Sequence, residues 1–158
     1  MDDAIAAIQS RIKSETAFSV GVGHPRSLRT QIVIWPWRIA RLPQARNPIP
    51  PNLSPTGLVQ PVPQLFAVDI LFLSKREIDS LTRVAKIIED NPLINIGDKR
   101  YHLVEQSLAP ELQVAIFSSA SLSLQPVLNY TISNINVVSD ALTDNAPPIL
   151  EKGRVVAK

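Results

Sequence analysis

The sequence contains no cysteine among its 158 residues, and only two histidines, five glycines and one methionine. The absence of cysteine excludes disulfide bridges, cysteine-ligated zinc and thiol nucleophiles. His24 and His102 lie far apart and lack the spacing of a metal-binding helix. Glycine-rich phosphate loops, GxSxG turns and Ser-His-Asp sets at family spacing are also missing. We therefore expect no catalytic residue, metal, cofactor or small-molecule substrate, and a protein that is not an enzyme.

Long apolar runs are missing as well. The longest candidate, residues 65–73, is interrupted by Asp69 and is far shorter than the roughly 20 residues needed to cross a bilayer. The acidic start, Met1-Asp2-Asp3, lacks the basic and apolar regions of a secretory signal. We expect a soluble protein that is made in the cytoplasm and has no membrane partner.

Acidic residues are absent between Glu15 and Asp69, although the whole chain has a net charge of only +2. This stretch contains arginines and no lysine, and arginine suits bidentate contacts with carboxylates and phosphates. Two interpretations remain open: a docking strip for an acidic protein or nucleic acid, or a solvated basic face. Nucleic acid is the less favoured partner, because the arginines are not interleaved with exposed aromatic residues. The arginines are Arg26, Arg29, Arg38, Arg41 and Arg46.

Two tryptophans, Trp35 and Trp37, flank Pro36 within this basic stretch. Their packing in the core or at a sheet edge is one interpretation, and an aromatic anchor for a partner protein is the other. We include both tryptophans with the five arginines as candidate partner-binding residues.

Proline is concentrated in the same part of the chain. Of the 14 prolines, those between Pro36 and Pro63 interrupt any helical or strand periodicity. This pattern predicts a long proline-rich arm at about residues 38–63, which is either a partner-binding arm or a flexible excursion. Residues 139–158 also lack a regular pattern and are expected to form a flexible tail. The domain itself should span residues 1–138.

The remaining pattern predicts a mixture of helices and strands. Ser74 and Glu77 have capping-box spacing before an amphipathic run, which predicts that a helix begins at about residue 75. We expect an α/β (α+β) fold with a small mixed or antiparallel sheet of about four to six strands, packed by two helices, with a long proline-rich loop. The expected helices are 2–14 and 75–90, and the expected strands are 30–35, 64–73, 93–96, 101–104, 112–116 and 127–137. Residues 18–22 are expected to form a short strand or an extended entry segment.

Five segments carry a resemblance to a known family. They are residues 64–73 (QLFAVDILFL), 78–81 (IDSL), 87–93 (IIEDNPL), 116–122 (IFSSASL) and 127–133 (VLNYTIS). In this order the sequence resembles the tail-terminator proteins of contractile phage tails and injection systems. It looks most like the cap proteins of extracellular contractile injection particles. The resemblance covers about residues 1–138.

This resemblance implies a structural protein. It implies a homo-oligomeric ring, a hexamer in the family, that closes the end of the tube and sheath away from the baseplate. The implied partners are further copies of the chain and the tube and sheath proteins. The implied location is an assembled phage-tail-like particle. The alternative from the residues alone is an arginine-mediated adaptor for nucleic acid or an acidic protein.

Overall fold

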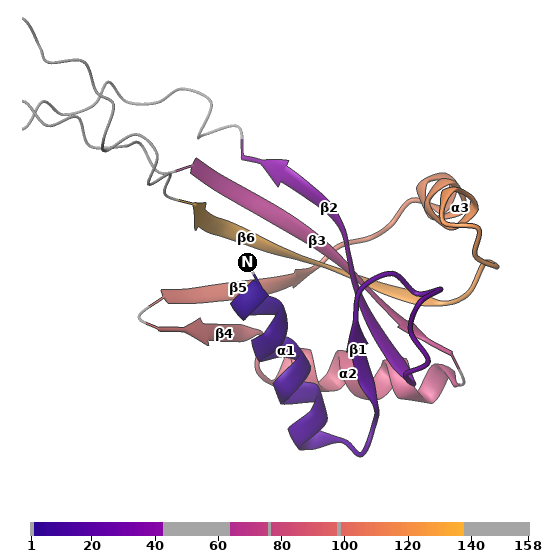
Figure 1. Ribbon diagram of the computed structural model, residues 1–158. Coiled ribbons are helices and arrows are strands. Elements are labelled where there is room, and N and C mark those ends of the chain that lie inside the picture. The colour runs from indigo at the N-terminus through magenta and orange to yellow at the C-terminus, as the bar shows by residue number, and fades with distance from the viewer. Residues whose placement is uncertain (1, 43–63, 76, 98, 138–158) are drawn as a thin grey trace, which may run out of the picture.

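The computed structural model describes residues 2–42, 64–75, 77–97 and 99–137, and all structural statements below concern these ranges. They form three helices and a six-stranded sheet with the order β1-β2-β3-β6-β5-β4 (Figure 1). Strand β1 is parallel to β2, and all other neighbouring strands are antiparallel. The mixed sheet confirms the expected α+β class. The elements are α1 (Asp2–Glu15), β1 (Val20–Val22), β2 (Ile32–Arg41), β3 (Gln64–Ser74), α2 (Ile78–Asp90), β4 (Leu93–Ile96), β5 (Lys99–Glu105), α3 (Pro110–Ser119) and β6 (Val127–Val137).

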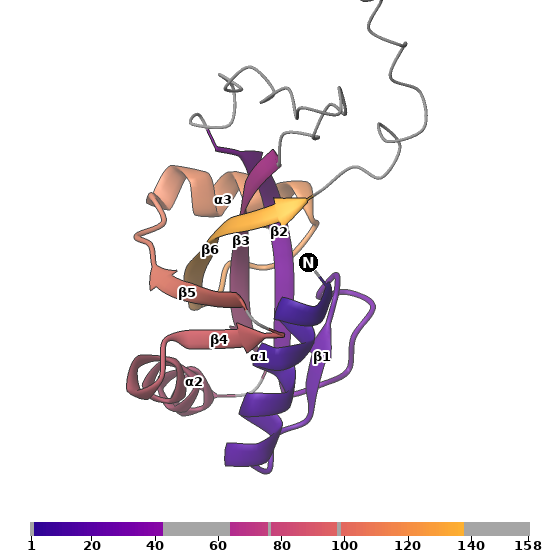
Figure 2. The same ribbon diagram turned by 90° about the vertical axis from the view of Figure 1, so that its left-hand side faces the viewer.

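Strand β3 lies near the centre of the sheet and is covered on both faces, as its apolar sequence predicts. Successive side chains of a strand point to opposite faces. Ile70 and Phe72 therefore join the core cluster that includes residues of α1 and α2. Leu71 and Leu73 face the other way and pack with Ile116 and Phe117 of α3. Figures 1 and 2 show α3 on the opposite side of the sheet from α1 and α2.

Helix α1 joins the two edges of the curled sheet, β1 and β4 (Figure 2). Its inward side chains Ile5, Ile8 and Ile12 are buried, which matches their helical spacing. The Gln9 amide donates a hydrogen bond to the Val20 carbonyl of β1, at 2.8 Å. The Arg11 guanidinium donates to the carbonyl of Asn91, the C-cap residue of α2, and to that of Leu93, the first residue of β4. The helix thus covers polar groups of both edge strands.

Three strand predictions are confirmed closely. Strands β4 and β5 form the expected antiparallel hairpin, and Gly97 in its turn has the left-handed φ of 54° that favours glycine. Strand β6 has the bounds that the alternation in residues 127–137 predicts.

The expected strand at residues 112–116 is wrong, because this segment belongs to α3. Pro110 occupies the first turn, where the missing amide hydrogen has no helical acceptor to lose. A short apolar run such as this one fits a buried strand or a helix equally well. The described part of the chain therefore has three helices where two were expected.

The capping-box prediction at Ser74 is also wrong, since α2 begins at Ile78 with Glu77 as its N-cap residue. Ser74 remains the last residue of β3 and is paired with Ile32 of β2. Its hydroxyl accepts a hydrogen bond from the Glu77 amide, at 3.3 Å. Strand pairing therefore holds the backbone of Ser74 out of the helix and delays the helix start.

Strand β2 is longer than the expected 30–35 and continues through Pro36 to Arg41. Pro36 is tolerated because β2 pairs with β1 only as far as Ile34. Beyond Ile34, the edge of β2 that faces away from β3 is not paired with β1. Residues 38–41 therefore belong to the sheet and not to the proline-rich arm. The rest of the arm, from residue 43 to 63 and including Arg46, lies outside the described residues, as does the expected tail at 139–158. The domain limit at residue 138 stays a prediction.

Tyr130 of β6 is a large buried polar side chain in the core, with 2% of its surface exposed. Its ring contacts the Phe72 ring edge-on, with the centroids 5.6 Å apart. Within the described residues its hydroxyl has no hydrogen-bond partner. Burial, with smaller contributions from the charges of Glu105 and Glu89, raises the pKa of Tyr130 from 10.0 to about 12.

Candidate partner-binding surface

The structure does not bring the candidate arginines together into one strip. Arg26 and Arg29 lie in the loop before β2, whereas Arg38 and Arg41 lie in the second half of that strand. Since a strand rises about 3.3 Å per residue, the length of β2 separates the two groups by roughly 20 Å or more. The predicted docking strip is therefore divided into two regions, and the binding role of each remains a prediction.

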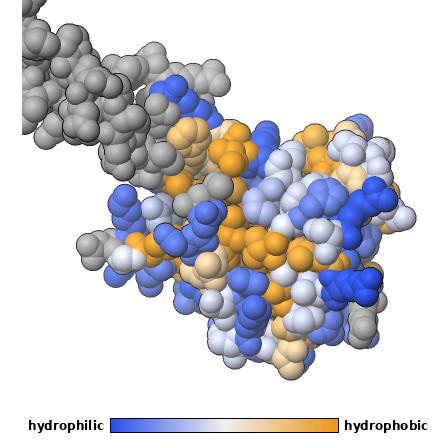
Figure 3. Space-filling view, in the orientation of Figure 1, coloured by the Kyte–Doolittle hydropathy of each residue, from blue (hydrophilic) through white to orange (hydrophobic). Residues whose placement is uncertain are grey.

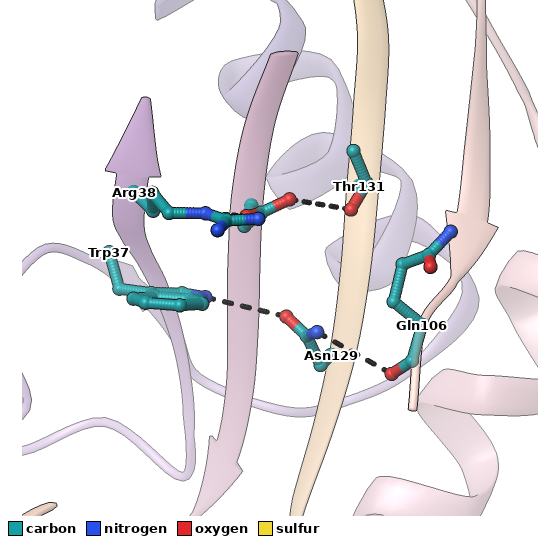
Figure 4. A network of polar contacts seen from close by, with 6 residues as sticks. Trp37, Arg38, Gln106, Asn129 and Thr131 are labelled. Carbon is teal, nitrogen blue, oxygen red and sulfur yellow. Dashed lines mark hydrogen bonds and ion pairs between the residues drawn. The ribbon is translucent and has the colours of Figure 1, made fainter. Parts of the chain in front are cut away.

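A bulge in β2 places two of the candidate residues on the same face of the sheet. Pro36 is paired with Ile70, and Arg38 is paired with Asp69, so that Trp37 is an extra residue between them. Figure 4 shows the Trp37 and Arg38 side chains projecting in the same direction, one above the other. The Arg38 guanidinium carbon lies 5.3 Å from the centre of a Trp37 ring, within the range of a cation–π contact.

Arg38 forms an ion pair with Asp69 of β3. The Arg38 Nε donates to one carboxylate oxygen, and the Thr131 hydroxyl donates to the other at 2.6 Å (Figure 4). The Asp69 side chain is only 6% exposed, so its negative charge requires these partners. The Arg38 side chain is 57% exposed and is held in place on its inner side.

A second row of polar contacts runs beside the first. The Trp37 indole Nε1 donates to the Asn129 side-chain oxygen at 3.4 Å, and the Asn129 amide donates to the Gln106 carbonyl at 3.4 Å. Asn129 is buried, and its backbone carbonyl also accepts a hydrogen bond from the Gln106 backbone amide at 2.8 Å. The two rows connect β2, β3, β6 and the segment after β5. They hold a guanidinium group in a fixed, half-exposed position, which suits recognition of a carboxylate.

The tryptophans are partly buried parts of the fold. Trp35 and Trp37 both pack against the cluster under α3. The Trp35 ring also contacts the His24 ring at 5.3 Å in an edge-on arrangement, which links β2 to the preceding loop. This packing agrees with the core interpretation, and a role as partner anchors stays a prediction.

Sequence reasoning missed Asp69, Asn129 and Thr131 as parts of this network. The available signal was the presence of Asp69 within the otherwise apolar run of residues 65–73, since buried polar groups need partners. Asn129 lies in a strand with several other polar residues and carried no such signal. Within the described ranges, no group of three or more histidine and acidic residues is placed to bind a metal. No helix among these residues has both the length and the apolar character of a membrane span.

Exposed apolar side chains occur on β2 and on α3. Figure 3 shows apolar surface gathered over the middle of the sheet and toward the free ends of its strands, bordered by hydrophilic residues. Ile39 of β2 is 56% exposed. On α3, Leu112 and Val114 are also exposed. Contiguous apolar surface of this kind is typical of protein–protein contacts.

Comparison with known proteins gives matches only at the level of structure. No family model and no curated protein matches the sequence. A sheath/tube terminator of the extracellular contractile injection system PVC superposes with a TM-score of 0.68 and 13% identity over 100% of this chain and 63% of that one. The tube-terminating cap of the anti-feeding prophage gives a TM-score of 0.63 and 14% identity over 99% of this chain and 61% of that one.

The first solved structure is named as a sheath/tube terminator of a contractile injection system, and the second as the tube-terminating cap of the anti-feeding prophage. The chain spans about three fifths of the length of each. At these identities the comparison concerns the fold, and the fold is the one that the family resemblance in the sequence implied. The chain has the fold of the terminator and cap proteins of contractile injection systems.

Proposed function

We propose that this chain is a structural subunit that terminates the tube and sheath of a contractile tail or injection particle. The observation that carries the proposal is the likeness in fold to two such terminators over essentially the whole chain. The described side chains also favour contact over turnover, because the Thr131 hydroxyl of the polar network donates to Asp69, a carboxylate that is already paired with Arg38 and is only 6% exposed.

In this proposal the subunits form a homo-oligomeric ring, a hexamer as in the resembled family, which stacks on the last tube and sheath subunits. A closed ring uses two different surfaces of each subunit, one complementary to the other. The exposed apolar side chains of α3 and β2 fit a chain whose surface is covered by neighbouring subunits. The protein would be made in the cytoplasm and incorporated into the particle there.

The proposal is tested by deleting the gene in the producing cell and measuring particle length by electron microscopy. Loss of a terminator is expected to give tubes of uncontrolled length, and the wild-type gene supplied in trans should restore the normal length distribution. Negative-stain images and native mass spectrometry of the purified chain should show a ring. Normal lengths in the deletion strain, together with a chain that stays monomeric at all concentrations, would overturn the proposal.

A further inference from the structure

A hydrophilic groove of about 430 Å³ opens where the loop before β2 meets the end of β3. It lies at the Arg29 end of the divided basic region and is distinct from the Arg38 network. Its lining combines two cationic side chains with two hydroxyl groups and one amide. The lining residues are Ser19, Arg29, Thr30, Gln31 and Lys75.

The groove is held in shape by hydrogen bonds between its own walls. The Ser19 backbone amide donates to the Gln31 side-chain oxygen at 3.3 Å, and the Gln31 backbone amide donates to the Ser19 hydroxyl at 3.0 Å. The Thr30 hydroxyl donates to the Ile32 carbonyl at 3.0 Å. The Lys75 ammonium donates to the Leu28 carbonyl, which fixes the lysine across the groove. A ligand therefore meets a largely preorganised site, which lowers the entropy cost of binding.

The charge of the groove is positive and has no acidic counterpart in its lining. Arg29 and Lys75 come from segments far apart in the sequence, and residues 16–42 contain no acidic residue. The closest acidic residue to Lys75 in the sequence is Glu77, which lines, together with Lys75, a second depression of about 120 Å³ and does not line the groove. A concave site with two cations and uncharged donors favours an anionic ligand group.

We infer that this groove binds a carboxylate side chain from an acidic segment of a neighbouring protein in the assembled particle. The inference rests on the proposed function for the identity of the neighbour as a particle component. The Arg29 guanidinium and the Lys75 ammonium supply charge-assisted donors, and the Ser19 hydroxyl, which accepts from the Gln31 backbone amide, keeps its proton as an uncharged donor. The site thus recognises one or two carboxylates of an extended acidic peptide.

A protein ligand fits the groove better than a nucleic acid does. Binding along a phosphate backbone uses a stripe of many cations, whereas this groove gathers two. No aromatic ring lines it, so single-stranded bases would find no stacking surface there.

The test is a fluorescence-anisotropy titration of the full chain with a labelled hexaglutamate peptide at low ionic strength. The variant Arg29→Gln/Lys75→Gln removes both cations of the groove. The matched control, Lys86→Gln/Lys99→Gln, removes the same charge from exposed residues outside it. A thermal melt of each protein verifies folding. The single variant Arg29→Gln keeps the hydrogen bond from Lys75 to the Leu28 carbonyl. It replaces the double variant in the titration if the double variant unfolds.

We expect the groove variant to bind the peptide with about tenfold lower affinity than the wild-type chain, and the control variant to bind it with little change. Equal losses in both variants would show attraction to net charge alone and would overturn it, as would absence of peptide binding by the wild-type chain. Tighter binding of an oligothymidylate of equal charge, with the same dependence on Arg29 and Lys75, would overturn the choice of a protein ligand. If the chain terminates particles but does not bind the peptide, this inference is wrong and the proposed function stands.

Discussion

The guanidinium of Arg38 is hydrogen-bonded to the carboxylate of Asp69, the one acidic residue within the apolar sequence of β3. The two residues are paired across neighbouring strands, next to the bulge at Trp37. Arg38 is 57% exposed and Asp69 is 6% exposed, so the arginine provides the contact between a buried charge and the surface. Arg38 therefore has a role in the fold that is independent of any partner.

The first prediction concerns this ion pair. Arg38→Met keeps the apolar stem but leaves Asp69 with Thr131 as its hydrogen-bond donor. We expect the free energy of unfolding at neutral pH to fall by about 1 to 3 kcal/mol, less than for a fully buried pair because Arg38 is half exposed. Urea denaturation followed by circular dichroism measures this. The control Arg26→Met alters an exposed loop arginine and should change stability by less than about 0.5 kcal/mol.

The companion variant Asp69→Asn separates charge from shape at the same site. In an Arg38→Met background, it should recover part of the lost stability, since the uncompensated carboxylate is then removed. Equal stability of wild type and Arg38→Met would show that Thr131 and solvent are enough to satisfy Asp69 and would contradict the assigned role of the ion pair.

The elements that could be predicted from the sequence are those with a strong local pattern. The isoleucine spacing of residues 2–14, the apolar run at 64–73 and the alternation at 127–137 each gave the right element. The segment at 112–116 did not, because a short apolar run fits both a helix and a strand, and its packing against Leu71 and Leu73 of β3 is a long-range contact.

The candidate surface was predicted only in part, for a similar reason. An arginine-rich composition indicates contact with anions, but it does not say which arginines meet in space. The pairing of Arg38 with Asp69 depends on strand register and on a bulge, neither of which has a local signal at Trp37. Lys75 reaches the loop before β2 only because β2 and β3 are antiparallel neighbours.

Gly21 of β1 provides the second prediction. A Cβ atom at this position would lie 2.7 Å from the Thr30 hydroxyl oxygen and 3.1 Å from the Thr30 methyl group. The hydroxyl is bonded to the Ile32 carbonyl, so it cannot move without losing that bond. We expect Gly21→Ala to lower the free energy of unfolding by about 1 to 3 kcal/mol, measured by urea denaturation.

Thr30→Ala gives the control for this effect, because it removes the two nearest atoms that the new methyl group would meet and leaves the Leu28 methyl carbon at 3.2 Å. The double variant Gly21→Ala/Thr30→Ala should be more stable than the sum of the two single effects predicts. Simple additivity would indicate that the cost at Gly21 does not come from Thr30.

The third prediction tests the core assignment. Ile70 of β3 and Leu81 of α2 are 0% and 4% exposed and belong to the same cluster. Each change to alanine should lower the free energy of unfolding by about 2 to 5 kcal/mol through the cavity that it leaves. Ile78→Ala is the matched control, because Ile78 is 65% exposed and its loss should cost less than about 0.5 kcal/mol. Comparable effects at Ile70 and Ile78 would contradict the burial pattern.

The last prediction concerns Tyr130, whose buried hydroxyl has no partner among the described residues. Tyr130→Phe removes a desolvated polar group and keeps the ring against Phe72. At pH 7 the variant should be as stable as the wild-type protein or more stable by about 1 kcal/mol. Chemical denaturation of both proteins at this pH provides the measurement. A loss of more than about 1 kcal/mol would instead indicate that the hydroxyl is hydrogen-bonded, for example to a buried water molecule.

The same pair of proteins should diverge at alkaline pH. Below pH 10 the Tyr130 hydroxyl is protonated in the folded and unfolded states alike. Above pH 10 the unfolded chain loses this proton, whereas the folded protein keeps it until the pH approaches its raised pKa of about 12. Deprotonation thus favours the unfolded state, and Tyr130 should cost the wild type about 2 kcal/mol by pH 12. The stability advantage of Tyr130→Phe should therefore increase between pH 9 and pH 11.5, and a constant difference across this interval would show that burial does not hold the phenol in its protonated form.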